Sequence, residues 1–253
     1  MRGAKLIFGL FGFLACCILS ITARAAQTIV AVATNFTEPA KEIATLFKQK
    51  TGDVAVLSFG ASGALYTQIS QDAPFQILLS ADDDRPRKLI ADGLAVASSR
   101  FTYAIGKLML WSRSADLVTG AETLRAGAFA KISIANPAIA PYGVAAIETM
   151  TSLKVLDALA SKIVRGNTIA QTFQFIDTGN AELGFVALSQ LTGITAGARW
   201  MVPQELYSPI RQDAVLLKTG AGNTAAIAFL AFLKGPEAKR VIEKYGFVLT
   251  GLN

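Results

Sequence analysis

The stretch "TIVAVATNFTEPAKEIATLFKQKTG", residues 28–52, sets the pattern that the rest of the chain repeats. Its first seven residues form an apolar run with β-branched side chains, which predicts a buried strand. Ile43, Ala44 and Phe47 then recur at helical spacing, and Gly52 marks the end of a helix over 38–52. A buried strand followed directly by a helix is the unit from which parallel sheets with helices on both faces are built.

The same alternation continues towards the middle of the chain. Two further strand–helix pairs are predicted, 53–60 with 62–71 and 75–81 with 84–93. Ser62 is the expected N-cap of its helix, and Pro86 stands in the first turn of the next one. Three such pairs in succession predict a parallel, doubly wound sheet.

The segment "FTYAIGKLMLWS", residues 101–112, is one mostly apolar run and predicts a long connecting strand. After it the alternation restarts, with strands expected at 131–137, 182–189 and 213–220 and helices at 142–159, 168–179, 223–235 and 236–246. We therefore predict an α/β protein with a two-lobed periplasmic-binding type of fold. Each lobe is a doubly wound sheet, and two crossing strands join them. Lobe I is expected at 26–104 and 212–253, and lobe II at 105–211.

Residues 1–25 read as a secretory signal peptide. Arg2 and Lys5 form its basic start, a long apolar run follows, and "ARA" at 23–25 provides the small residues of a cleavage site. A membrane anchor is the alternative, but the segment is short and ends in small residues. We therefore expect an exported protein, located in the periplasm.

The missing residue types restrict the chemistry of the mature chain. Its only cysteines, Cys16 and Cys17, lie inside the signal, and Phe13 stands where a lipoprotein signal prefers Leu, so lipidation is not expected. With no histidine in the 253 residues, neither a Ser-His-Asp triad nor an imidazole zinc site can form. "GASGA", residues 60–64, resembles a nucleophile elbow, but no base serves Ser62.

Charge argues against nucleic acid as a partner. Removing the three basic residues of the signal from the 24 in the chain leaves 21, against 18 acidic residues, which is a net charge of +3. That excess is small and dispersed along the sequence, whereas nucleic-acid binding calls for a concentrated basic surface.

Two motifs have a structural reading beside a functional one. "GAGNTA", residues 220–225, fits a loose dinucleotide fingerprint, but too little chain follows for a nucleotide-binding lobe, so Asn223 or Thr224 is expected to cap a helix. "ADDDR", residues 81–85, could hold a hard cation. We favour three carboxylates at the N-terminus of the helix that contains Pro86.

Hydroxyl and amide side chains recur where predicted strands or loops meet helices. The junctions are Thr34-Asn35, Ser62, Pro141-Tyr142-Gly143 and Thr168-Ile169. In a doubly wound sheet such junctions lie at the carboxyl ends of the strands, where ligands bind. Helix N-termini suit anions, and only Arg165 adds a nearby positive charge. Each junction alone could be an ordinary cap, but together they predict a neutral anion cleft.

Six segments, in this order, resemble the periplasmic molybdate-binding proteins of ABC transporters. They are "VAVATNFTEPAKEIA", "LSFGASGALYTQI", "ILLSADDDRPRKL", "ANPAIAPYG", "ELGFVALSQ" and "FLKGPEAKRVIEKYGF", and the last is the most specific. The resemblance covers residues 27–249. It implies a two-lobed binding protein, not an enzyme, that closes on molybdate or tungstate, needs no cofactor or directly bound cation, and delivers its ligand to a membrane permease, with a monomer expected.

Carried over by position, the resemblance implies that five residues hold the oxyanion through hydroxyl, amide and backbone N–H groups: Thr34, Asn35, Ser62, Tyr142 and Ile169. One position departs from the family, because Ala187 stands where many members carry a tyrosine. We expect the phenol of Tyr142 to replace it, the alternative being that Tyr142 is a surface turn residue. Two rival functions stay open: a binding protein for sulfate or phosphate, and a secreted enzyme that uses neither histidine nor cysteine.

Overall fold

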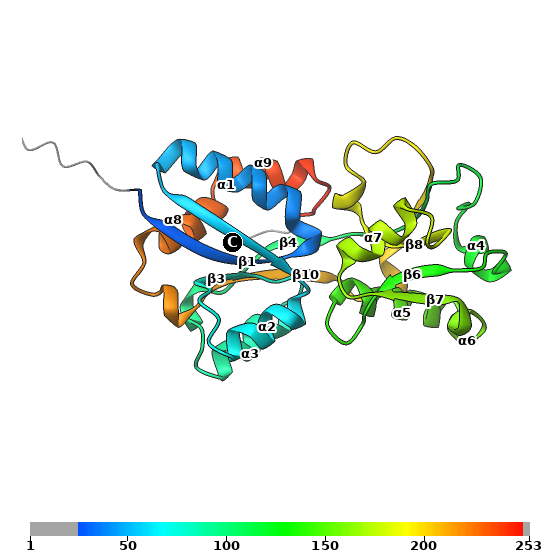
Figure 1. The fold of residues 1–253 in the computed structure, drawn as a ribbon, viewed down its shortest axis with the longest axis horizontal. Coiled ribbons are helices and arrows are strands. Elements are labelled where there is room, and N and C mark those ends of the chain that lie inside the picture. Colours follow the sequence, from blue (N-terminus) through cyan, green and yellow to red (C-terminus); the bar gives the residue numbers. More distant parts are fainter. Residues whose placement is uncertain (1–24, 250–253) are drawn as a thin grey trace, which may run out of the picture.

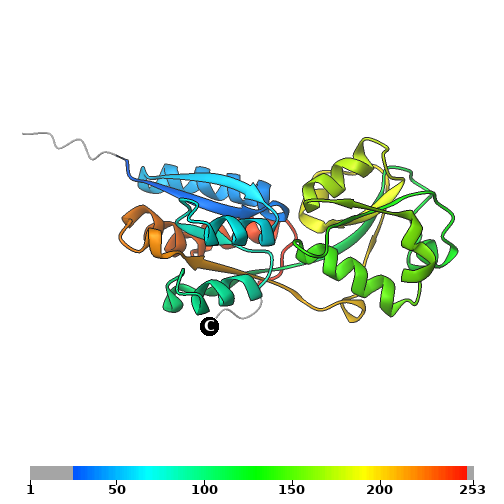
Figure 2. The ribbon, with the colours of Figure 1, turned by 60° about the horizontal axis from the view of Figure 1, so that its bottom comes forward.

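A computed structural model describes residues 25–249 of the chain. Two five-stranded sheets lie side by side, each covered by helices, and extended segments cross from one to the other (Figures 1 and 2). The predicted α/β architecture with two doubly wound sheets is confirmed. The signal-peptide prediction falls on residues 1–25, which apart from the last lie outside the described residues.

The first sheet has the strand order β2-β1-β3-β10-β4. Its strands are β1 (Gln27–Ala33), β2 (Val54–Gly60), β3 (Ile77–Leu79), β4 (Phe101–Gly106) and β10 (Ile210–Leu216). Strand β1 pairs in parallel with β2 and β3, whereas β10 runs antiparallel to both β3 and β4. The carboxyl ends of the parallel strands β1, β2 and β3 therefore lie together, at the end of the sheet that faces the second sheet (Figure 1).

Helices cover both faces of the first sheet. They are α1 (Thr37–Thr51), α2 (Ser62–Ser70), α3 (Asp84–Ala91), α8 (Thr224–Leu233) and α9 (Pro236–Lys244). On one face α1, α8 and α9 bury an aromatic core in which Phe47 and Phe229 meet edge to face at 5.3 Å. On the other face Leu65 and Leu89 of α2 and α3 pack against the sheet. Two buried faces explain why these strands read as continuous apolar runs.

The capping interpretation of "GAGNTA" is confirmed. The side chain of Asn223 accepts a hydrogen bond from the N–H of Ala225 at 2.9 Å and so caps α8. A capping asparagine satisfies an N–H group that the first turn of a helix leaves without a carbonyl partner.

The second sheet has the order β7-β6-β8-β5-β9. Its strands are β5 (Leu108–Ser112), β6 (Ile132–Ala135), β7 (Ile163–Gly166), β8 (Leu183–Ala187) and β9 (Ala198–Met201). Its helices are α4 (Ala121–Ala126), α5 (Pro141–Ser152), α6 (Leu156–Leu159) and α7 (Ile169–Asp177). The sequence pattern did not predict α4, β7 or β9, because each is only 4 to 6 residues long and carries little periodicity.

The prediction of one strand over 101–112 is wrong. Strand β4 ends at Gly106 in the first sheet, and β5 begins at Leu108 in the second. Lys107 between them is the first crossing point, and the chain returns between Met201 of β9 and Ile210 of β10. An apolar run shows that a segment is buried but not which sheet supplies its partners, so periodicity could not place the break. The proposed lobe limits at 104–105 and 211–212 stay a prediction.

The prediction of one helix over 142–159 is also wrong, because α5 ends at Ser152 and α6 starts at Leu156. Between them Lys154 adopts a left-handed φ of 58°. The backbone N–H of Val155 donates to the carbonyl of Met150 at 2.9 Å, which closes the end of α5. Apolar residues continue at helical spacing through both helices, which hides the break in the sequence.

No helix within the described part of the chain combines the length and the apolar character that a membrane span needs.

Candidate functional site: a neutral pocket between the two sheets

One small pocket lies where the carboxyl ends of the parallel strands of the two sheets face each other. It is lined by Ala33, Thr34, Asn35, Gly60, Ala61, Ser62, Ala81, Ala140, Pro141, Tyr142 and Ile169. All five residues singled out in the sequence are therefore brought to a single pocket. Their action as ligands stays a prediction.

Four helix beginnings meet at this pocket. Helix α2 starts at Ser62, α5 at Pro141 and α7 at Ile169. The fourth is a short 3₁₀ turn at Thr34–Phe36, which runs directly into α1. The N–H groups in the first turn of a helix have no carbonyl partner within it, and the helix dipole places partial positive charge there. The helix N-termini therefore favour a negatively charged ligand, and they do so without the help of a charged side chain.

Ser62 does not cap α2 as the sequence predicted. The N-cap position belongs to Ala61, and no side chain caps this helix. Instead, the Ser62 hydroxyl oxygen accepts a hydrogen bond from the backbone N–H of Ala81 at 2.9 Å. Ala81 follows β3, so only the tertiary fold brings this N–H to Ser62. Because the oxygen is occupied as an acceptor, the hydroxyl hydrogen can donate into the pocket.

Asn35 connects the pocket to the rest of the molecule. It is buried, and its Nδ2 donates to Oε1 of Gln212 on β10 at 2.9 Å. Its backbone carbonyl accepts from the hydroxyl of Ser189 at 2.7 Å, a bond that joins the two lobes. Neighbouring Thr34 is half-buried, and its carbonyl accepts from the hydroxyl of Thr37 at 2.8 Å.

Tyr142 is not a surface turn residue. Only 2% of it is exposed, and it belongs to the first turn of α5. Its phenol oxygen accepts from Nε2 of Gln212 at 3.4 Å. Burial raises the pKa of Tyr142 well above its ordinary value, and the nearby phenol of Tyr207 adds to the rise, while the amides of Gln212 and Asn35 oppose it. The phenol therefore keeps its hydrogen at neutral pH and can act as a donor.

Ile169 is the first residue of α7, and two side chains hold the first turn of this helix by hydrogen bonds. The hydroxyl of Thr168 accepts from the N–H of Gln171 at 3.0 Å, which caps the helix. Nε2 of Gln190 donates to the carbonyl of Ile169 at 3.1 Å, and Oε1 of the same side chain accepts from the N–H of Ala187. Ile169 lines the pocket, and its backbone N–H, at the first position of the helix, has no carbonyl partner within the helix.

The lining of the pocket carries no Lys, Arg, Asp or Glu among the described residues. Arg165, the basic residue nearest to a junction in the sequence, is exposed on β7 and does not line it. Glu38, the acid closest to the first junction, is exposed and pairs with Lys41 at 2.7 Å. The pocket thus offers neutral donors, and the lining includes no carboxylate that could accept a hydrogen bond from a protonated ligand.

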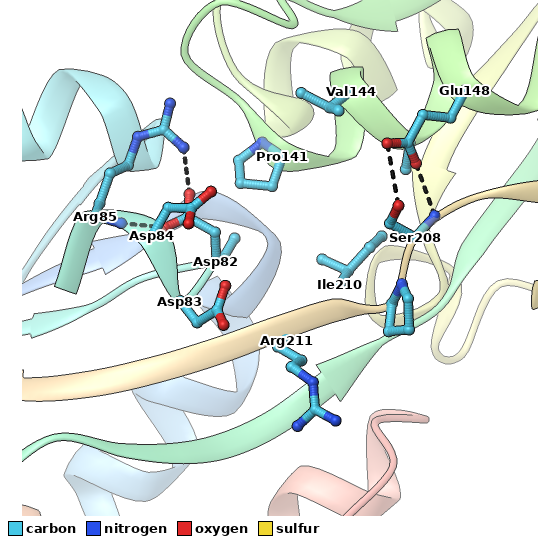
Figure 3. Close-up of a pocket in the computed structure, with 13 residues that line it drawn as sticks. Asp82, Asp83, Asp84, Arg85, Pro141, Val144, Glu148, Ser208, Ile210 and Arg211 are labelled. Carbon is cyan, nitrogen blue, oxygen red and sulfur yellow. Dashed lines mark hydrogen bonds and ion pairs between the residues drawn. The ribbon is translucent and has the colours of Figure 1, made fainter. Parts of the chain in front are cut away.

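A wider depression adjoins this pocket and shares Ala81 and Pro141 with it (Figure 3). Most of its acidic groups already have partners within the protein, whereas the guanidinium of Arg211 also lines it. Asp82 binds Arg85, and the carboxylate of Glu148 accepts from the backbone N–H of Ser208 at 2.7 Å. The "ADDDR" motif contributes to this depression, with Arg87 holding Asp83 and Asp84. The carboxylates of this depression repel an anion, so the donors of the neutral pocket suit one better.

The two lobes touch beside the pocket. The backbone N–H of Gly63 donates to the carbonyl of Ile139 at 2.9 Å, and Nη2 of Arg85 donates to the carbonyl of Ala138 at 3.4 Å. A Cβ at Gly63 would lie 2.9 Å from Cα of Ile139, so a larger residue would hold the lobes apart. The two lobes are therefore in direct contact beside the pocket.

Two contributors to the pocket were missed by sequence reasoning. One is the backbone of Ala81, which carries no side-chain signal at all. The other is Gln212, which is fully buried and contacts Asn35 and Tyr142 from the second crossing strand. The only sign in the sequence was the polar run Arg211-Gln212-Asp213, directly before the apolar residues Ala214–Leu216.

The chain is similar in sequence and in structure to known binding proteins. The chain matches the family of bacterial extracellular solute-binding proteins over residues 28–248. It is 53% identical over 230 residues to the molybdate-binding protein ModA of Rhodobacter capsulatus, covering 91% of each chain. It is 50% identical over 236 residues to ModA of Azotobacter vinelandii, covering 92% of this chain and 94% of that one. The solved periplasmic molybdate-binding protein of Azotobacter vinelandii superposes with a TM-score of 0.85 at 41% identity, over 88% of this chain and 99% of that structure.

Proposed function

Since this chain belongs to the bacterial extracellular solute-binding protein family, we propose that it captures molybdate in the pocket between its lobes and delivers it to an ABC permease. The observation that carries this proposal is the meeting of four helix beginnings at one pocket whose described lining is free of charged side chains. The Rhodobacter and Azotobacter relatives, which bear the name of molybdate-binding proteins, support the choice of ligand.

Five residues hold the oxyanion in this proposal. The hydroxyls of Thr34, Ser62 and Tyr142, the amide of Asn35 and the backbone N–H of Ile169 donate to its oxygens. A hydrogen bond to a charged group contributes about 1.5–3 kcal/mol, so a handful gives tight binding after the cost of ordering and closure. Tyr142 enters from the second lobe and supplies the phenol that Ala187 lacks.

Ligand selection follows from the positions of the hydrogen-bond donors and from the absence of a carboxylate acceptor in the described lining. Molybdate and tungstate share a charge and a tetrahedral shape, so both are expected to bind in this pocket. Sulfate is smaller and leaves some donors unmet, and an unmet buried donor is costly. Phosphate carries a proton near neutral pH, and the described lining has no carboxylate to accept it.

The protein acts in the periplasm as a binding protein and not as an enzyme. Export through the segment 1–25, a monomeric state and the absence of a nucleic-acid partner complete the proposal. The periplasmic location of the superposed Azotobacter protein supports the compartment. The closed arrangement of the lobes is the form that a permease distinguishes from the empty, open one.

Calorimetric titration of the mature chain with molybdate, tungstate, sulfate and phosphate tests the proposal. We expect molybdate and tungstate to bind with similar affinity and each to raise Tm by mass action. Sulfate at the same concentration should raise Tm far less. A larger rise with sulfate or phosphate, or turnover of a substrate by the purified protein, would reject the proposed function.

A further inference from the structure

Gln212 occupies a central place beside the pocket without lining it. It lies on β10, one of the crossing strands, and is fully buried. Its Oε1 accepts from Nδ2 of Asn35 at 2.9 Å and faces the phenol oxygen of Tyr103 at 3.1 Å. Its Nε2 donates to the phenol oxygen of Tyr142 at 3.4 Å. One side chain thus joins a ligand-binding residue of the first lobe to one of the second.

The surrounding residues hold this amide in place. Tyr103 of β4 is 1% exposed, its hydroxyl also lies 3.1 Å from the carbonyl oxygen of Ser80, and its ring packs edge to face on Phe36 at 4.9 Å. Gly106 leaves space for the hydroxyl of Tyr142 and the amide of Gln212, because it has no side chain. A Cβ there would lie 2.1 Å from the Tyr142 hydroxyl oxygen and 2.7 Å from Nε2 of Gln212. Only a glycine lets the phenol and the amide meet at the crossing strand.

The direction of the amide decides what Tyr142 can do. A phenol has one hydrogen, and its oxygen can also accept. When that oxygen accepts from Nε2 of Gln212, the hydrogen is free to point into the pocket that Tyr142 lines. If the amide were turned round, the phenol would donate to Gln212 and present only lone pairs to the anion. The hydroxyl hydrogen of Ser62 is free to point into the pocket for the same reason, because its oxygen accepts from the N–H of Ala81.

We propose that Gln212 is a positioning residue that makes Tyr142 a hydrogen-bond donor to the bound oxyanion. The inference rests on the proposed function and deepens it, because it assigns part of the ligand selectivity to a residue outside the pocket lining. With Tyr142 and Ser62 both held as donors, the site favours a fully deprotonated dianion over a ligand that carries a proton.

The decisive test combines Gln212→Glu with Tyr142→Phe in a double-mutant cycle, with molybdate affinity as the readout. A carboxylate at 212 accepts from Asn35, Tyr103 and also Tyr142, so the phenol hydrogen turns away from the pocket. These three donors favour the charged form of the carboxylate, and titrations at pH 9 favour it further. In the parent, Tyr142→Phe should weaken binding about ten- to a hundredfold. In the Gln212→Glu background, the same change should cost less than about twofold.

The cycle removes the effect of the added charge, because that charge is present in both Gln212→Glu proteins. Ser62→Ala provides the matched control, since the hydroxyl oxygen of Ser62 accepts from Ala81 and not from Gln212. Its cost should be the same in both backgrounds, whereas general damage to the pocket would reduce it. An equal cost of Tyr142→Phe with and without Gln212→Glu would overturn the inference.

The outcomes also separate this inference from the proposed function. A parent protein that does not bind molybdate contradicts the function itself. A parent that binds tightly, with Tyr142→Phe binding as well as the parent, leaves the function standing and rejects the role of Gln212.

Gln212→Met serves if the glutamate variant does not fold. The phenol oxygen then loses its amide donor and can accept from a protonated ligand, so inorganic phosphate should compete with molybdate at least about tenfold better. Adding Tyr142→Phe should remove that gain. A folded Gln212→Met protein that discriminates against phosphate as the parent does would overturn the inference, because a purely structural defect weakens both anions alike.

Discussion

The hydroxyl oxygen of Ser62 lies 2.9 Å from the backbone nitrogen of Ala81 and accepts its N–H. Ser62 opens α2, whereas Ala81 follows β3, and both groups are buried. The bond fixes the serine rotamer and leaves the hydroxyl hydrogen for the pocket. Ser62 therefore has a role in the fold besides the one that we propose for it toward the ligand.

Ser62→Ala is expected to change both affinity and stability. Loss of one hydrogen bond to a charged ligand should weaken molybdate binding about tenfold or more, and the buried N–H of Ala81 left without a partner should lower the free energy of unfolding by about 1–3 kcal/mol. Titration and urea unfolding of the same preparation measure the two effects. Unchanged affinity together with lowered stability would reduce Ser62 to a structural residue.

Arg165→Gln should cost less than about twofold in molybdate affinity, because Arg165 is exposed and does not line the pocket. Added chloride should likewise weaken binding only modestly, since buried interactions are screened far less than exposed ones. Calorimetry at low and at high chloride concentration, on parent and variant, checks both statements. Near-total loss of binding in the variant would contradict a neutral site.

Gly63→Ala should weaken molybdate binding by opposing closure. The added Cβ would lie 2.9 Å from Cα and 3.1 Å from Cβ of Ile139 across the lobe contact. Overpacking of this kind costs about 1–3 kcal/mol, or roughly five- to a hundredfold in affinity. Small-angle X-ray scattering with saturating molybdate should show a larger average radius than the parent.

Gly222→Ala is the matched control for that experiment, because nothing lies within 4 Å of a Cβ at this position. It should bind molybdate and close like the parent. If Gly63→Ala also binds and closes like the parent, the contact between Gly63 and Ile139 does not limit closure.

Tyr142 should make the protein sensitive to alkali. Burial raises the pKa of its phenol in the folded protein well above the unfolded value of 10.0. A raised pKa contributes stability that is fully present below the unfolded pKa and is lost as pH rises from there towards the folded pKa. Above pH 10 the parent should therefore lose up to about 1.4 kcal/mol of unfolding free energy per pH unit more than Tyr142→Phe. Urea unfolding of both proteins from pH 9 to pH 11 measures this difference, and parallel curves would contradict it.

Much of the fold was predictable from local patterns. The segment 28–52 is β1 followed by α1, with Gly52 in a left-handed conformation as the C-cap. Asn223 caps α8 as predicted. These features depend on side-chain periodicity, on the φ freedom of glycine and on hydrogen bonds between near neighbours in the chain. The breaks at Lys107 and Lys154 were not predictable, because the apolar pattern runs on through both.

By itself, the sequence determined the alternation of strands and helices, the two-sheet architecture and the positions of the junctions that carry Thr34, Ser62, Tyr142 and Ile169. Each of these follows from residues close together in the chain. Only the tertiary structure decided which atoms remain free to bind. The Ser62 hydroxyl oxygen accepts from Ala81 and the Tyr142 phenol oxygen from Gln212, partners 19 and 70 residues away in the chain. A hydroxyl can donate or accept, and its choice depends on the neighbour that occupies its oxygen, which folding alone brings into contact.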